Sequence, residues 1–66
     1  MKNRVRELRK LKGLTQEQLA EVIGVSRQTI NAIEKEKFDP SLTTAFKMSK
    51  LFDLPIEDFF LFQETS

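Results

Sequence analysis

The side chains with the most specific chemistry in this sequence are a guanidinium group, two amides and a hydroxyl gathered over residues 27–31. A guanidinium group matches the O6 and N7 acceptors of guanine, and an amide matches the N6 and N7 atoms of adenine. The side chains that fit this chemistry are Arg27, Gln28, Thr29 and Asn31. The pattern indicates a surface that contacts base edges, and an ordinary polar helix surface is the alternative.

The same segment has the apolar spacing of a helix that buries one face. Ile30 and Ile33 lie three residues apart, and at 100° per residue they place Gln28 on the opposite side. Ser26 comes just before this segment and is a favourable N-cap residue. No acid that would repel phosphate occurs between Ser26 and Glu34. We therefore predict a helix that buries its isoleucines and exposes its polar side chains.

A second predicted helix and a short turn come before that one. Thr15 and Gln18 have the spacing of a capping box, in which each side chain bonds to the backbone of the other residue. The apolar face that follows is formed by Leu19, Ala20 and Ile23. Gly24 then marks a turn of about three residues. Helix, turn and helix over about residues 15–35 predict a helix-turn-helix, a shape that helical hairpins without DNA function share.

The rest of the chain completes an all-α prediction of five short helices. The apolar residues that define the other three are Val5, Leu8 and Leu11 or Lys12 in the first, Leu42, Ala45, Met48 and Phe52 in the fourth, and Ile56, Phe59 and Phe60 in the fifth. Gly13 ends the first helix. Ser41 caps the fourth, and Asp53 takes the left-handed position at its end. The segment 60–63 could also form a short terminal strand.

Composition limits what this chain can do. Its 66 residues predict one domain, 1–66, with a C-terminal tail over about 61–66. The absence of Cys and His excludes a thiol nucleophile and the common zinc ligand sets. No Gly-rich phosphate loop occurs, because the two glycines are Gly13 and Gly24. We expect no enzyme activity, no cofactor, no metal and no small-molecule ligand.

Charge and hydropathy indicate the surroundings. Residues 1–37 hold nine basic and five acidic side chains, a net charge of +4, whereas residues 38–66 hold two and five, a net charge of −3. The basic part could face a polyanion, or it could be a solvated helix surface. No apolar run approaches the roughly 20 residues of a membrane span, and the N-terminal segment lacks the apolar stretch of a signal peptide. We expect a cytoplasmic protein of bacterial, archaeal or phage origin.

Residues 14–34 resemble, in order, the helix-turn-helix of the lambda-repressor/Cro-like, XRE-type family. The resemblance extends from about Val5 to Phe60 and includes residues 40–42 and 54–59. It implies a regulator that binds double-stranded DNA sequence-specifically, reads the major groove with the helix after Ser26, and acts as a repressor. A protein–protein adaptor and an antitoxin that represses its own operon remain alternatives.

The resemblance also implies roles for single residues. The base contacts fall on Arg27, Gln28 and Thr29, beside Asn31. The phosphate contacts fall on Gln16, Arg9 and Lys37, and Arg9 also matches a family pair with Glu34. Two positions depart from the family pattern. Glu36 stands where a Gly is common, so it must take a left-handed conformation at some cost or the helix must end differently. Pro55 stands where a Ser cap is usual.

Four apolar residues in a row near the C-terminus predict a homodimer. Ile56 and Phe59 are needed for the core by analogy with the family, which leaves Phe60 or Phe62, with Leu61, as the predicted dimer surface. The alternative is that Phe62 folds back onto its own domain. The tail could also pair as a strand with its own N-terminus or with its mate. A symmetric dimer would match a palindromic operator with half-sites one helical turn apart.

Overall fold

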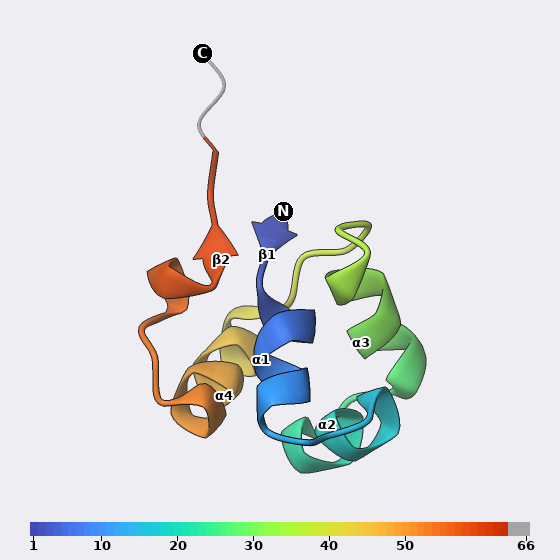
Figure 1. Cartoon of the computed structure of the whole chain (residues 1–66). Coiled ribbons are helices and arrows are strands. Elements are labelled where there is room, and N and C mark those ends of the chain that lie inside the picture. The colour runs from blue at the N-terminus through green and yellow to red at the C-terminus, as the bar shows by residue number, and fades with distance from the viewer. Residues whose placement is uncertain (64–66) are drawn as a thin grey trace.

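The computed structural model describes residues 1–63, so the part of the predicted tail over 64–66 lies outside the described residues. The chain runs through β1 (Lys2–Asn3), α1 (Val5–Leu11), α2 (Gln16–Ile23), α3 (Arg27–Glu34), α4 (Leu42–Phe52), η1 (Ile56–Asp58) and β2 (Phe60–Leu61) (Figure 1). The predicted helical fold with a helix-turn-helix is confirmed. The fifth predicted helix is only a three-residue 3-10 helix, closed by a bond from the Phe59 amide to the Ile56 carbonyl.

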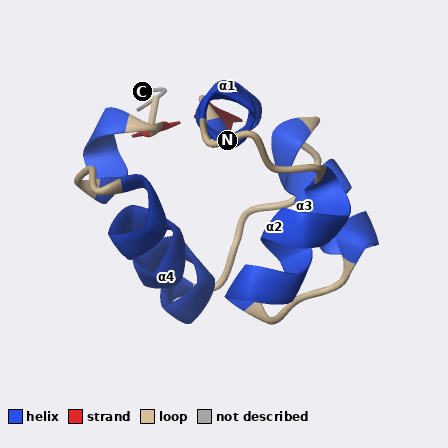
Figure 2. Ribbon diagram, turned by 60° about the horizontal axis from the view of Figure 1, so that its bottom comes forward, coloured by secondary structure: helices blue, strands red, loops and turns tan. Residues whose placement is uncertain are grey.

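The helices form two sides joined through α1. Figure 2 shows α2 and α3 on one side, α4 on the other, and α1 between them at one end. β1 and β2 pair in antiparallel fashion, with Lys2 opposite Leu61 and Asn3 opposite Phe60. The terminal strand therefore pairs with the N-terminus of its own chain, which is one of the two pairings considered from the sequence.

The core fills the space between the two sides. Its buried apolar residues are Val5, Leu8, Leu19, Ala20, Ile23, Ile30, Ile33, Ala45, Met48, Phe52, Phe59 and Phe60. Two residues predicted for apolar faces are exposed, Leu11 at the end of α1 and Leu42 at the start of α4. Their places on the inner faces are taken by Arg9 and Thr44, because each inner face is rotated relative to the predicted one.

Phe60 requires a correction. It was predicted as part of a dimer surface, but it is only 5% exposed and its ring lies 5.0 Å from that of Phe59. Successive side chains of a strand point to opposite faces, so burying Phe60 turns Leu61 outward. Phe60 therefore belongs to the core of its own domain.

Side-chain caps fix where the helices of the helix-turn-helix begin. The backbone amide of Gln18 donates to Thr15 Oγ1 at 3.1 Å, and the backbone amide of Thr15 donates to the Gln18 side-chain oxygen Oε1 at 2.9 Å. These two bonds complete the predicted capping box. Ser26 caps α3 through the Thr29 amide. Gly24 ends α2 with a φ of 89°. After α3, Glu36 takes the left-handed conformation, with a φ of 64°, where the family often has glycine.

Candidate nucleic-acid interface

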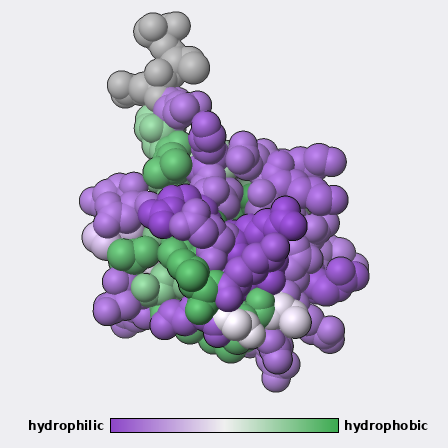
Figure 3. Space-filling model, viewed as in Figure 1, coloured by the Kyte–Doolittle hydropathy of each residue, from purple (hydrophilic) through white to green (hydrophobic). Residues whose placement is uncertain are grey.

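α3 is held on α2 so that its polar side faces outward. Ile30 and Ile33 are fully buried, and Arg27 and Gln28 are exposed in the first turn of the helix. Hydrophilic residues cover the side of the molecule on which α3 lies, whereas hydrophobic residues gather toward the opposite side and along the C-terminal strand (Figure 3). The two most direct candidates for base contact are therefore free to meet a ligand.

The other two candidate base-contacting residues are less open. The Thr29 hydroxyl lies 2.9 Å from Ser26 Oγ, within the cap of α3, and the residue is half-buried. Asn31 is also half-buried, and its Oδ1 accepts a bond from Gln16 Nε2 at 3.3 Å. Both side chains thus have partners inside the protein, so the polar surface of α3 is not uniform.

Arg9 and Glu34 form a buried ion pair that joins α1 to α3. Arg9 Nε donates to Glu34 Oε2 at 2.7 Å and Nη2 donates to Oε1 at 3.2 Å. Nη1 donates to the Leu14 carbonyl at 2.8 Å. The two side chains are only 9% and 3% exposed. Arg9 therefore makes the pair suggested by the sequence, but it cannot also make the predicted phosphate contact, because its guanidinium group is buried and engaged.

The ion pair lines a polar cleft that lies between α1 and the start of α2 on one side and α3 on the other. The residues that line it are Arg6, Arg9, Gln16, Asn31, Glu34 and Lys35. Arg6 and Lys35 are exposed cations. Lys37, in the loop after α3, is exposed as well. The structure thus gathers basic and amide groups on the face that carries α3, as a polyanion site requires.

Sequence reasoning missed one contributor to this face and one hydrogen bond that holds α3 in place. Arg6 belongs to the basic N-terminal part, but only the fold brings it beside Lys35. Asn3 in β1 donates through Nδ2 to the Ile33 carbonyl at 2.8 Å, which ties the end of α3 to the N-terminal strand. No spacing rule relates residues 30 positions apart, so this bond had no signal in the sequence.

Elsewhere on α1, an acid is neutralised by its neighbour. Arg4 Nη2 donates to Glu7 Oε2 at 2.7 Å, and this bond and the positive charge hold the pKa of the Glu7 carboxyl below its usual value.

Over residues 1–63, no group of three or more His, Cys, Asp or Glu side chains is placed to hold a metal ion. Within that part of the chain, every helix is too short or too polar to cross a membrane.

Two helices packed across a three-residue turn, with the polar face of the second helix exposed, form the helix-turn-helix architecture. The helix-turn-helix family model matches residues 5–59. The chain therefore belongs to the XRE-type helix-turn-helix family of transcriptional regulators, which are DNA-binding proteins and not enzymes.

Individual relatives agree with this assignment. A helix-turn-helix transcriptional regulator of Methanocaldococcus jannaschii is 56% identical over 64 residues, which cover 97% of each chain. The phage CTXphi transcriptional repressor RstR of Vibrio cholerae is 36% identical over 64 residues, 97% of this chain and 58% of that protein. Among solved structures, the restriction-modification controller protein C.AhdI of Aeromonas hydrophila superimposes with a TM-score of 0.76 at 35% identity over 86% of each chain.

Proposed function

We propose that this protein is a sequence-specific repressor that places α3 in the major groove of double-stranded DNA. The observation that supports this most directly is the exposure of Arg27 and Gln28 in the first turn of α3, on a helix held by two buried isoleucines. Arg27 donates to guanine, Gln28 pairs with adenine, and Thr29 contacts the adjoining base. The resemblance to a phage repressor supports repression as the outcome.

Phosphate contacts flank this base-reading surface. Gln16 is the first residue of α2, and its contact is made by its backbone N–H, because the free N–H groups and the dipole at the start of a helix favour an anion. Lys37 supplies a cation in the loop after the C-terminal end of α3, although Glu36 beside it weakens the local positive potential. These contacts position α3 on the duplex without reading its sequence.

An adaptor that binds another protein is the competing function, and salt dependence separates the two. Each phosphate neutralised by the protein lowers the slope of log K against log salt by about 0.9. With contacts at Lys37, Arg6 and Lys35, we expect affinity for any duplex to fall steeply between about 50 and 200 mM salt. Fluorescence anisotropy with a labelled duplex measures this. A protein that binds no duplex even at 50 mM salt would favour the adaptor or a purely protein-binding antitoxin.

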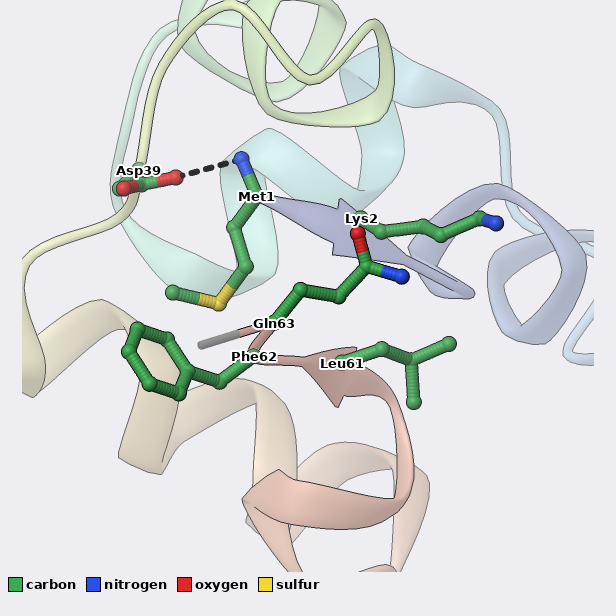
Figure 4. Close-up of a pocket in the computed structure, with 6 residues that line it drawn as sticks. All are labelled: Met1, Lys2, Asp39, Leu61, Phe62 and Gln63. Carbon is green, nitrogen blue, oxygen red and sulfur yellow. Dashed lines mark hydrogen bonds and ion pairs between the residues drawn. The ribbon is translucent and has the colours of Figure 1, made fainter. Parts of the chain in front are cut away.

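We further propose that the protein acts as a homodimer through the surface around β2. Leu61 and Phe62 are 37% and 72% exposed, so Phe62 does not fold back onto its own domain. Figure 4 shows Phe62 and Met1 pointing toward the same open groove, one end of which is bounded by the ion pair between the Met1 amine and Asp39. In a two-fold dimer, the apolar surface at Leu61 and Phe62 of one subunit would be covered by the same surface of the other subunit.

The dimer predicts that Phe62→Ser shifts the protein to a monomer. The substitution removes an exposed aromatic ring and leaves the core intact, so the free energy of unfolding of the monomer should change little. Phe46→Ser on α4 is the matched control, because Phe46 is also exposed and lies outside the groove. Light scattering at micromolar concentration measures the mass. Two results together would show that no such dimer operates. The native protein would be a monomer at this concentration, and Phe62→Ser would bind palindromic DNA as tightly as the native protein.

A further inference from the structure

The buried carboxylate of Glu34 decides which way two neighbouring amides face. An ionised carboxylate only accepts hydrogen bonds. Gln16 therefore presents its NH₂ group, and Nε2 donates to Glu34 Oε1 at 3.1 Å. Arg9 donates to both oxygens of the same carboxylate through two nitrogens, so these oxygens act as acceptors and the Gln16 orientation is fixed. The assignment follows from donor and acceptor chemistry, which is how amide orientations are decided.

The orientation of the Gln16 side chain in turn fixes the orientation of the Asn31 side chain. Gln16 Nε2 has two protons, and the one not directed to Glu34 is donated to Asn31 Oδ1 at 3.3 Å. Asn31 thus turns its oxygen toward Gln16 and its Nδ2 group away from it. The end of Gln16 that is left over is Oε1, which is an acceptor and cannot bond to a phosphate oxygen.

We propose that Glu34, acting through Gln16, holds the Asn31 amide with Nδ2 directed outward to donate a hydrogen bond to a DNA phosphate oxygen. Arg6 and Lys35 line the same cleft, and their charges favour a phosphate over a base edge. A bidentate bond to adenine needs Oδ1 and Nδ2 on one edge, and Oδ1 is turned to Gln16. Asn31 is then a phosphate contact and not a base contact, and the side chain of Gln16 is a positioning residue. This inference rests on the proposed DNA binding.

The orientation itself is tested without DNA. In ¹⁵N-edited NMR spectra of the free protein, we expect the side-chain NH₂ protons of Gln16 to exchange slowly with water and to show cross-relaxation with the Asn31 side chain. The Asn31 NH₂ protons should exchange faster. In Gln16→Ala, the Asn31 NH₂ signals should change most. Slow exchange at Asn31 with fast exchange at Gln16 would overturn the orientation.

The phosphate contact is tested by a double-mutant cycle on DNA affinity at one salt concentration. Loss of one hydrogen bond in Asn31→Ala should weaken binding roughly three- to tenfold, equally on the preferred site and on unrelated duplex. Gln16→Ala should weaken it no more than that, and the double variant should match Asn31→Ala. Gln18→Ala, which removes an α2 amide that bonds only to the Thr15 backbone, is the control.

Three outcomes of this cycle would overturn the proposal. A loss in Asn31→Ala confined to the preferred site would make Asn31 a base contact. Full additivity of the two losses would make Gln16 a direct contact. Failure of the native protein to bind any duplex would remove the proposed function and with it the phosphate contact, while the NMR result on the free protein would still decide the amide orientation. Thermal unfolding of each variant verifies that it is folded.

Discussion

Removing Glu34 alone should destabilise the protein more than replacing Glu34 and Arg9 together. The two side chains are almost completely buried, so Glu34→Ala leaves the Arg9 guanidinium group without its partner in a site from which water is largely excluded. Breaking a buried pair in this way costs about 3–5 kcal/mol. Replacing both residues by apolar side chains of similar volume, as in Arg9→Met with Glu34→Leu, avoids the stranded charge and should cost clearly less.

Thermal unfolding monitored by circular dichroism measures this difference. In a domain of 60–100 residues, each 1 kcal/mol corresponds to a shift of roughly 4–8 °C in Tm, so Glu34→Ala should be conspicuously less stable. Glu7→Ala is the matched control, because it breaks the exposed pair with Arg4 and should leave Tm nearly unchanged. If Arg9→Met with Glu34→Leu lost as much stability as Arg9→Met alone and Glu34→Leu alone added together, Arg9 and Glu34 would not be coupled.

The second large effect is expected at the base-reading residues. Arg27→Ala and Gln28→Ala should each weaken binding to the preferred site by about 1–3 kcal/mol, because a bidentate contact with a base is lost. Both side chains are exposed, so the fold should be unaffected. On unrelated duplex the loss should be small. Anisotropy titrations on both duplexes at one salt concentration measure the two losses.

Lys37→Ala supplies the contrast for this experiment. A phosphate contact carries no sequence information, so its loss should weaken binding equally on both duplexes and reduce the salt slope by about one. Equal losses for Arg27→Ala on the two duplexes would instead place Arg27 among the phosphate contacts and leave Gln28 as the base reader to be tested.

The sequence predicted the elements that follow local rules. Thr15 and Gln18 made their capping box, Ser26 capped α3, and Ile30 with Ile33 defined its inner face, because caps and helical periodicity depend on residues three or four apart. These local features are enough to build a helix-turn-helix. They also leave Arg27 exposed without any further information.

The errors arose where long-range packing decides. The sequence suggested for Arg9 both a pair with Glu34 and a phosphate contact, and only the fold shows that the buried pair leaves no guanidinium group free for phosphate. Phe60 and Phe62 are equally apolar and lie two residues apart, so strand periodicity alone cannot separate them. Only the fold shows that Phe60 lies in β2 and is buried, whereas Phe62 lies beyond the end of the strand and is exposed. The orientation of the Asn31 amide depends on the same distant carboxylate.

Selection of bound sequences from random duplex DNA by the native protein tests the central claim most directly. We expect one enriched sequence, a palindrome whose half-sites are about one helical turn apart. The affinity for that sequence should exceed that for unrelated duplex by about a thousandfold or more at the same salt concentration. Recovered sequences without a common motif, bound no more tightly than random DNA, would contradict base reading by α3.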